Sequence, residues 1–116
     1  MKNFLTLFGC AAVLFINGCC CDNEKQIVME ENAILLDVRT PVEFQQGHIR
    51  GAVNLPLDRI DADAAKVIPA KNTPVYLYCR SGRRSKSARE KLLQQGYTEI
   101  TDSGSMSNAG KLLIRR

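Results

Sequence analysis

The chain is poor in residues that several classes of function require. It has four phenylalanines, three tyrosines, no tryptophan and one histidine among 116 residues. Nucleic-acid-binding proteins usually combine a long basic stripe with interleaved aromatic residues, and so few aromatic residues argue against that class. No set of histidines, cysteines and acidic residues has the spacing of a metal site, and no glycine-rich loop of the nucleotide-binding kind is present. We therefore expect no metal, no cofactor and no nucleic-acid partner.

Long hydrophobic runs are also scarce. The longest one, residues 4–16, has about thirteen residues, whereas a transmembrane helix needs roughly twenty. It follows Lys2 and ends in the small and polar residues Asn17 and Gly18, which is the pattern of an export signal. We expect a signal peptide over residues 1–18 and a protein that faces the periplasm.

The end of this signal, Ile16–Cys19, resembles a bacterial lipobox. Cys19 would then be the lipidated first residue and a membrane tether. Asn17 departs from the usual residue at its position, so secretion without a lipid is an open alternative. Because neither Cys20 nor Cys21 is an aspartate, which would suggest retention at the inner membrane, the lipidated form is expected at the outer membrane.

Cysteines are too few in the folded part for a disulfide scaffold. Cys10 lies in the signal, and Cys19, Cys20 and Cys21 lie in a polar tether over residues 19–25. Only Cys79 belongs to the remaining segment, 26–116. A lone domain cysteine in an exported protein favours a reactive thiol. For Cys20 and Cys21 we favour tolerated residues in a flexible tether.

The rest of the composition indicates one small globular domain, which we expect to be a monomer. The chain is 45% hydrophobic and 24% charged, with a net charge of +4. Its positive charge is concentrated between Arg80 and Lys91, where Glu90 is the only acidic residue. This local cluster predicts an anion site.

Short apolar runs alternate with helical patterns along the domain. Strands are expected at 33–38, 52–55, 75–78 and 99–101, and a strand or short helix at 26–31. Helices are expected at 40–46, 61–68, 85–95 and 109–114. The first helix should open with a capping box formed by Thr40 and Glu43. The alternation predicts an α/β fold, an open parallel sheet with helices on both faces.

The segment that carries chemistry follows the expected strand 75–78. A strand that leads through a short loop into a helix directs several N–H groups, and the positive end of the helix dipole, at one point. A thiol at that point has a lowered pKa, so we expect Cys79 to be a thiolate nucleophile. The alternative, an inert buried cysteine, leaves the nearby arginines Arg80, Arg83 and Arg84 unexplained.

Several motifs in register resemble the single-domain rhodanese family of sulfurtransferases. They are Leu36–Arg39, Glu43-Phe44, Gly47–Pro56 and the loop that starts at Cys79. The resemblance spans about residues 26–116 and implies the rhodanese-like parallel sheet. It also implies that Cys79 takes the sulfane sulfur of thiosulfate or another small donor. The resulting persulfide would pass this sulfur to cyanide or a thiol.

The resemblance also implies roles for the residues around Cys79. The loop N–H groups would surround the persulfide, while Arg80 and Arg84 would hold the donor's sulfonate oxygens. The substrate-binding candidates are Arg80, Ser81, Gly82, Arg83, Arg84 and Ser85, and for Arg83 simple solvent exposure is the alternative.

Three residues outside the loop also need an interpretation. Asp37 and Arg39 are supporting candidates. Arg39 either shapes the pocket or pairs with Asp37 or Glu43, and we favour the pairing because charged residues beside a helix start usually pair locally. His48 is expected to order a loop, as its motif does in the resembled family, and not to act as a base.

Two alternatives stay open. Phosphatases and arsenate reductases of the same fold have five residues between cysteine and arginine, whereas here four separate Cys79 from Arg84 and Ser85 follows. This shorter loop favours a sulfur donor. A non-catalytic binding module is the other alternative, although such modules often lack the cysteine. The stretch Ser103–Met106 departs from the glycine pair and aromatic residue that the family often has there.

Overall fold

The computed structural model describes residues 26–114. The predicted signal peptide, the tether and the lipidation candidate Cys19 lie outside the described residues. The strands are β1 (Ile27–Val28), β2 (Ile34–Asp37), β3 (Val53–Asn54), β4 (Val75–Cys79), β5 (Ile100–Ser105) and β6 (Leu113–Ile114). The helices are α2 (Pro41–Gln46), the 3-10 turn η3 (Leu57–Arg59), α3 (Ile60–Val67), α4 (Arg83–Gln94) and α5 (Met106–Leu112). Within residues 26–114, no helix has the length and apolarity that crossing a membrane requires.

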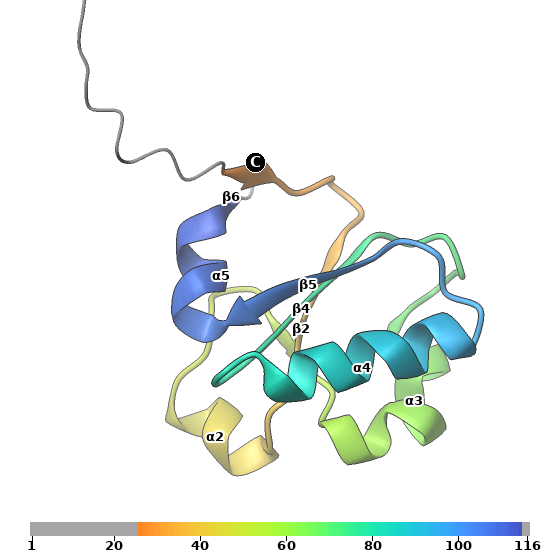
Figure 1. Cartoon of the computed structure of the whole chain (residues 1–116), viewed down its shortest axis with the longest axis horizontal. Helices are drawn as coiled ribbons and strands as arrows, with labels where there is room; N and C mark the ends of the chain where they lie inside the picture. Colours follow the sequence, from red (N-terminus) through yellow and green to blue (C-terminus); the bar gives the residue numbers. More distant parts are fainter. Residues whose placement is uncertain (1–25, 115–116) are drawn as a thin grey trace, which may run out of the picture.

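The centre of the domain is a four-stranded parallel sheet with the strand order β3-β2-β4-β5. Strands β1 and β6 form a separate parallel pair that joins the two ends of the described chain (Figure 1). The expected α/β fold with a parallel sheet is therefore confirmed. Because the order places β4 between β2 and β5, the loop after β4 leaves the sheet between two neighbouring strand ends.

The two faces of the sheet carry two hydrophobic clusters. Alternate residues of β4 divide between them: Val75, Leu77 and Cys79 face the cluster with α3 and α4, whereas Tyr76 and Tyr78 face the cluster with α5. All five residues of β4 are buried. Figure 1 shows α3 and α4 on one side of the sheet and α5 on the other. This arrangement confirms the prediction of helices on both faces.

The starts of helices α2 and α4 are explained by their N-cap residues. Helix α2 opens with the predicted capping box: Glu43 N–H donates to Thr40 Oγ1 at 3.3 Å, and Thr40 N–H donates to Glu43 Oε1 at 3.0 Å. Helix α4 starts at Arg83, two residues before the expected start. Its N-cap is Gly82, whose φ of 94° lies in the left-handed region that glycine adopts without strain.

The C-terminal elements differ from the prediction. The sequence predicts a last strand at 99–101, but β5 runs on to Ser105, which lies opposite Cys79 in the sheet. Leu77 pairs with Asp102 and Cys79 pairs with Ser105, so β5 has one residue more than β4 between these two pairs, and the register shifts there. The last helix, predicted at 109–114, is instead α5 at Met106–Leu112, with the Ser105 hydroxyl as its cap, and residues 113–114 form β6 because they pair with β1. The residues at the end of β5 are small and polar, so the sequence pattern does not predict a strand there. Pairing with β4 stabilises it.

Candidate active site

Cys79 is the last residue of β4 and lies just ahead of the N-terminus of α4. Its side chain is buried, with 0% exposure. The Gly82 N–H donates to Sγ at 2.9 Å, and the Ser85 hydroxyl oxygen lies 3.8 Å from Sγ. The sulfur therefore sits within the turn that connects the strand to the helix, as the strand-loop-helix pattern predicts.

The surroundings of the thiol have opposing effects on its acidity. Burial raises the pKa of Cys79, whereas hydrogen bonds from the backbone N–H groups of Ser85, Gly82 and Ser81 lower it, and the pKa lies below its ordinary value. The N-terminus of α4 adds a favourable dipole for an anion. The predicted thiolate character of Cys79 is consistent with this geometry.

Gly82 allows the loop to close this tightly. Besides its positive φ, its Cα lies against the β5 end: a Cβ at this position would be 3.5 Å from the Gly104 Cα. Arg80, Ser81 and Arg83 are exposed on the outside of the same loop. The loop thus presents backbone N–H groups inwards and its charged side chains outwards.

Arg84 pairs with Glu43, a residue that lies far from it in the sequence. Its two guanidinium nitrogens donate to the two carboxylate oxygens of Glu43 at 2.7 and 3.0 Å. Hydrogen bonds from Arg84, and then from Thr40, lower the pKa of Glu43 to about 2. Arg84 therefore links α4 to α2, a contact that the sequence analysis did not anticipate.

Asp37 and Arg39 form a buried ion pair, as we favoured from the sequence. Arg39 Nη2 lies 2.7 Å from Asp37 Oδ2 and also donates to the Gly47 carbonyl at 2.6 Å. The Tyr78 hydroxyl donates to Asp37 Oδ2 at 2.8 Å and accepts the Ile49 N–H at 3.0 Å. Hydrogen bonding to Asp37 raises the pKa of Arg39, against the smaller effect of burial. This network holds the segment after α2 against β4.

An open cavity of about 400 Å³ lies beside the loop, between α2 and the start of α5. We call it the α2–α5 cavity. Two of the predicted site residues, Arg39 and Arg80, line it together. Its other walls are made by Glu43, Gln46, Gly47, Met106 and Ser107. The two alternatives for Arg39 are therefore compatible, because it pairs with Asp37 and also forms part of a cavity wall.

His48 lies with α2. Its ring stacks on Phe44 with the ring centroids 3.6 Å apart, and Nδ1 is 2.8 Å from the Phe44 carbonyl oxygen. These contacts agree with an ordering role for the segment after α2.

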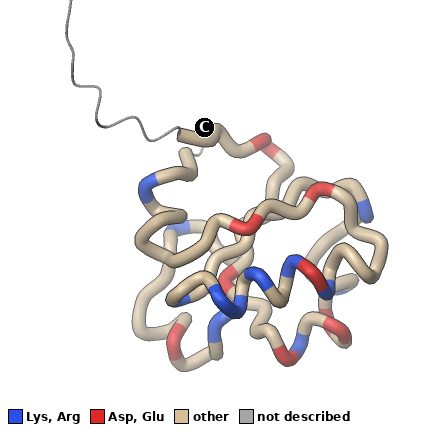
Figure 2. Tube along the Cα trace, in the orientation of Figure 1, with Lys and Arg blue, Asp and Glu red and all other residues tan. Residues whose placement is uncertain are grey.

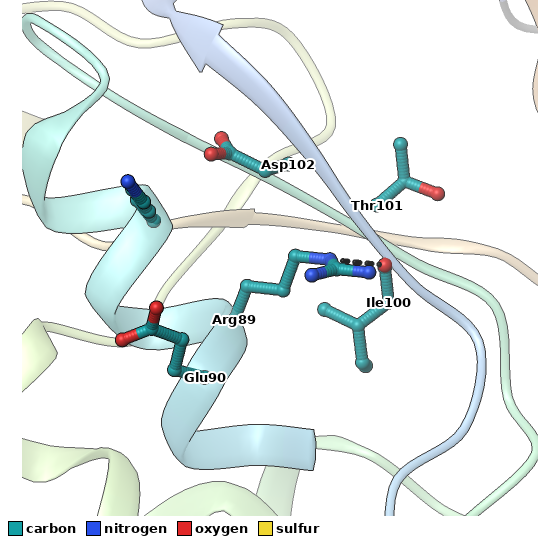
Figure 3. A pocket seen from close by; sticks show the side chains of 6 residues that line it. Arg89, Glu90, Ile100, Thr101 and Asp102 are labelled. Atoms are coloured by element: carbon teal, nitrogen blue, oxygen red, sulfur yellow. Dashed lines mark hydrogen bonds between the residues drawn. The ribbon is translucent and has the colours of Figure 1, made fainter.

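Asp102 of β5 is a site residue that the sequence analysis missed. The buried Ser85 hydroxyl donates to Asp102 Oδ1 at 2.6 Å, and the Gly104 N–H donates to the same oxygen at 2.9 Å. Figure 3 shows the Asp102 carboxylate between β5 and α4. One signal could have indicated it: Asp102 is an acidic residue near the carboxyl end of the strand beside β4, where parallel sheets place their sites.

Comparison with known proteins gives a consistent result. The family model described as a rhodanese-like domain matches residues 23–107. The thiosulfate sulfurtransferase PspE of Escherichia coli (strain K12) is 40% identical over 73 residues, which cover 63% of this chain and 70% of PspE. A sulfurtransferase of Allochromatium vinosum is 41% identical over 76 residues, which cover 66% of this chain and 69% of the relative.

A solved structure supports the same assignment. The structure described as a rhodanese with anions from E. coli has 38% sequence identity and a TM-score of 0.63, and the match covers 66% of this chain and 89% of that one. Fold, cysteine loop and family match agree with one another. The chain belongs to the rhodanese-like family.

Proposed function

We propose that the protein is a thiosulfate sulfurtransferase that carries sulfur as a persulfide on Cys79. One observation supports this most directly: the Cys79 sulfur accepts the Gly82 N–H at 2.9 Å just ahead of the N-terminus of α4. A sulfur anion is stabilised at such a position without a general base. The sulfurtransferases among the relatives agree with this function.

The reaction has two displacement steps. The Cys79 thiolate attacks the sulfane sulfur of thiosulfate, the sulfur–sulfur bond of thiosulfate breaks, and its electron pair leaves with sulfite. The enzyme then carries a cysteine persulfide. An acceptor such as cyanide or a thiolate attacks the outer sulfur, and the electron pair of the persulfide bond returns to Cys79. With cyanide the product is thiocyanate.

Arg80 is our leading candidate for binding the donor's sulfonate group. It is exposed, follows the nucleophile directly and shares the α2–α5 cavity with Arg39. Arg84 would first have to leave its two bonds to Glu43. We therefore assign the sulfonate to Arg80, assisted by the positive charge of Arg39, and assign Arg84 to holding α4 against α2.

The size of the loop favours sulfur over phosphorus. Ser85 follows Cys79 after five intervening residues. It is buried and donates a hydrogen bond to Asp102. A phosphate-handling loop of this fold would instead present an arginine to the anion there. The buried Ser85, in place of that arginine, supports a sulfur donor over a phosphate.

Thiocyanate formation from thiosulfate and cyanide tests this function in the purified full chain. The wild type should form thiocyanate, Cys79→Ser should form none, and Cys21→Ser, a cysteine outside the predicted domain, should keep the wild-type rate. If the wild type instead hydrolyses phosphate esters and forms no thiocyanate, the sulfur assignment is wrong. If it does neither, the non-catalytic binding module gains support.

Location and anchoring form a separate proposal. We propose an exported, periplasmic protein with Cys19 as its lipidated residue, on the basis of the N-terminal sequence pattern alone.

A further inference from the structure

The Ser85 hydroxyl has one proton and three acceptors within reach. Its oxygen lies 2.6 Å from Asp102 Oδ1, 3.1 Å from the Gly82 carbonyl oxygen and 3.8 Å from Cys79 Sγ. A hydroxyl donates one hydrogen bond at a time, so these acceptors compete. The direction of this one bond decides whether Ser85 stabilises the Cys79 thiolate.

Distance and charge favour Asp102 in this competition. Hydrogen bonds from a hydroxyl to a carboxylate are short and strong, and 2.6 Å falls in that range. The carboxylate is itself fixed, because the Gly104 N–H donates to the same oxygen from within β5. With its proton directed at Asp102, the Ser85 oxygen presents lone pairs to Cys79. These can accept the thiol S–H but give nothing to a thiolate.

We propose that Asp102 is a positioning residue that withholds the Ser85 proton from Cys79, so that backbone N–H groups alone stabilise the thiolate. A less stabilised thiolate is a stronger nucleophile, because nucleophilicity falls as the pKa of the thiol falls. This proposal rests on the proposed function only in taking Cys79 as the nucleophile.

Other charged groups lie around this chain of contacts. Helix α4 contributes Lys86, Arg89 and Glu90 to the open cavity that Asp102 also lines (Figure 3). Arg89 Nε donates to the Ile100 carbonyl at 3.0 Å. Arg84 interacts electrostatically with Cys79. Figure 2 shows basic positions gathered along α4. Among residues 26–114, the hydrogen-bonding contacts between Asp102 and the Cys79 sulfur run through the Ser85 hydroxyl.

The test measures how fast iodoacetamide alkylates Cys79 in the full chain as a function of pH, with the modified peptide quantified by mass spectrometry. Asp102→Asn keeps an oxygen for the Gly104 N–H but binds the Ser85 proton less strongly. It should lower the midpoint of the Cys79 profile by about one pH unit. The plateau rate at high pH should fall about threefold, because the thiolate becomes a weaker nucleophile.

A second background separates action through Ser85 from plain charge. In Ser85→Ala, Asp102→Asn should shift the midpoint far less, since the hydroxyl is gone. An equal shift in both backgrounds would mean that Asp102 acts by its charge alone, and would overturn the proposal. The proposal would also be overturned if Asp102→Asn, with Ser85 intact, left the midpoint of the Cys79 profile unchanged or raised it.

Ser85→Ala with Asp102 intact gives an independent reading if the Asp102 variant folds poorly. The proposal predicts little change of the midpoint, whereas a Ser85 proton donated to the thiolate predicts a rise of about one pH unit, which would contradict the proposal. Glu90→Gln is the matched control, because it removes a carboxylate from the same cavity without touching Ser85. Its profile should match the wild type. Alkylation needs no sulfur donor, so this result is separate from failure of the proposed function.

Discussion

At the scale of single residues, the environment of one sulfur atom explains most of the chemistry. Cys79 has no exposed surface, yet its pKa is lowered, because hydrogen bonds to the loop outweigh the effect of burial. Backbone geometry therefore lowers the pKa of the thiol, and in our proposal Asp102 acts on it through Ser85. Arg39 and Arg80 line the α2–α5 cavity, and Arg84 links α4 to α2.

Arg80, which lines the α2–α5 cavity, carries a kinetic prediction. Arg80→Ala should lower kcat/KM for thiosulfate about 10- to 100-fold, chiefly through KM, since a hydrogen bond to a charged group contributes about 1.5–3 kcal/mol. Steady-state kinetics with thiosulfate as the varied substrate checks this. Arg50→Ala, an exposed arginine outside the α2–α5 cavity, should leave KM unchanged. Equal losses in both variants would show that net charge, and not position, matters.

The glycine at the start of α4 carries a stability prediction. Gly82→Ala should lower the free energy of unfolding by about 1–2 kcal/mol, because alanine is strained at a φ of 94°. Urea denaturation measures the change. In the interior of α5, Gly110 has open space around it, so Gly110→Ala should instead stabilise by about 0.5–1 kcal/mol. A Gly82→Ala variant as stable as the wild type would contradict the left-handed backbone conformation at this position.

At the scale of elements, the contact between α2 and α4 joins two segments that the sequence presents separately. The capping box of α2 places Glu43 with its carboxylate held by Thr40, and the first turn of α4 brings Arg84 to it. The local part was predictable, because a capping box is a four-residue pattern. The pairing across 41 residues was not, because it depends on how the sheet positions both helices.

This ion pair predicts a dependence of stability on pH. The pKa of Glu43 falls from 4.5 in the unfolded chain to about 2 in the folded protein, so the ionised form favours folding. The stabilisation is complete above the unfolded pKa and is lost as the pH falls toward the folded pKa. Glu43→Gln should be less stable than the wild type at neutral pH, and the difference should shrink in acid.

Urea denaturation at a series of pH values measures this difference. Glu99→Gln, an exposed glutamate before β5, is the control and should show no such convergence. The effect is small because both partners are partly exposed, with 32% and 22% of their side-chain surface accessible. A Glu43→Gln curve parallel to the wild type at every pH would contradict the ion pair.

At the scale of the whole molecule, the alternation of strands and helices was enough to predict the parallel sheet and its two covered faces. The buried run of β4 and the capping signals mark elements locally. The path of β5 to Ser105 could not be predicted, since its residues are small and polar and its register is set by Cys79 across the sheet. The contact between Ser85 and Asp102 could not be predicted either, because it joins α4 to β5 and depends on how the sheet places them.

The chain outside the described residues carries one prediction for the whole protein. If Ile16–Cys19 is a lipobox, metabolic labelling with a fatty-acid analogue in a bacterial host should mark the wild type, and Cys19→Ala should remove the label. Cys20→Ala is the matched control and should keep it. Secretion of an unlabelled wild-type protein would instead support cleavage without lipidation.

The central claim is that Cys79 carries the transferred sulfur, and mass spectrometry of the intact chain together with its Cys79 peptide tests it most directly. After treatment with thiosulfate, the full chain should gain the mass of one sulfur atom on the peptide that contains Cys79, and cyanide should remove it. Cys79→Ser should gain nothing on that peptide. A wild-type protein whose Cys79 peptide keeps its mass under these conditions would contradict the account.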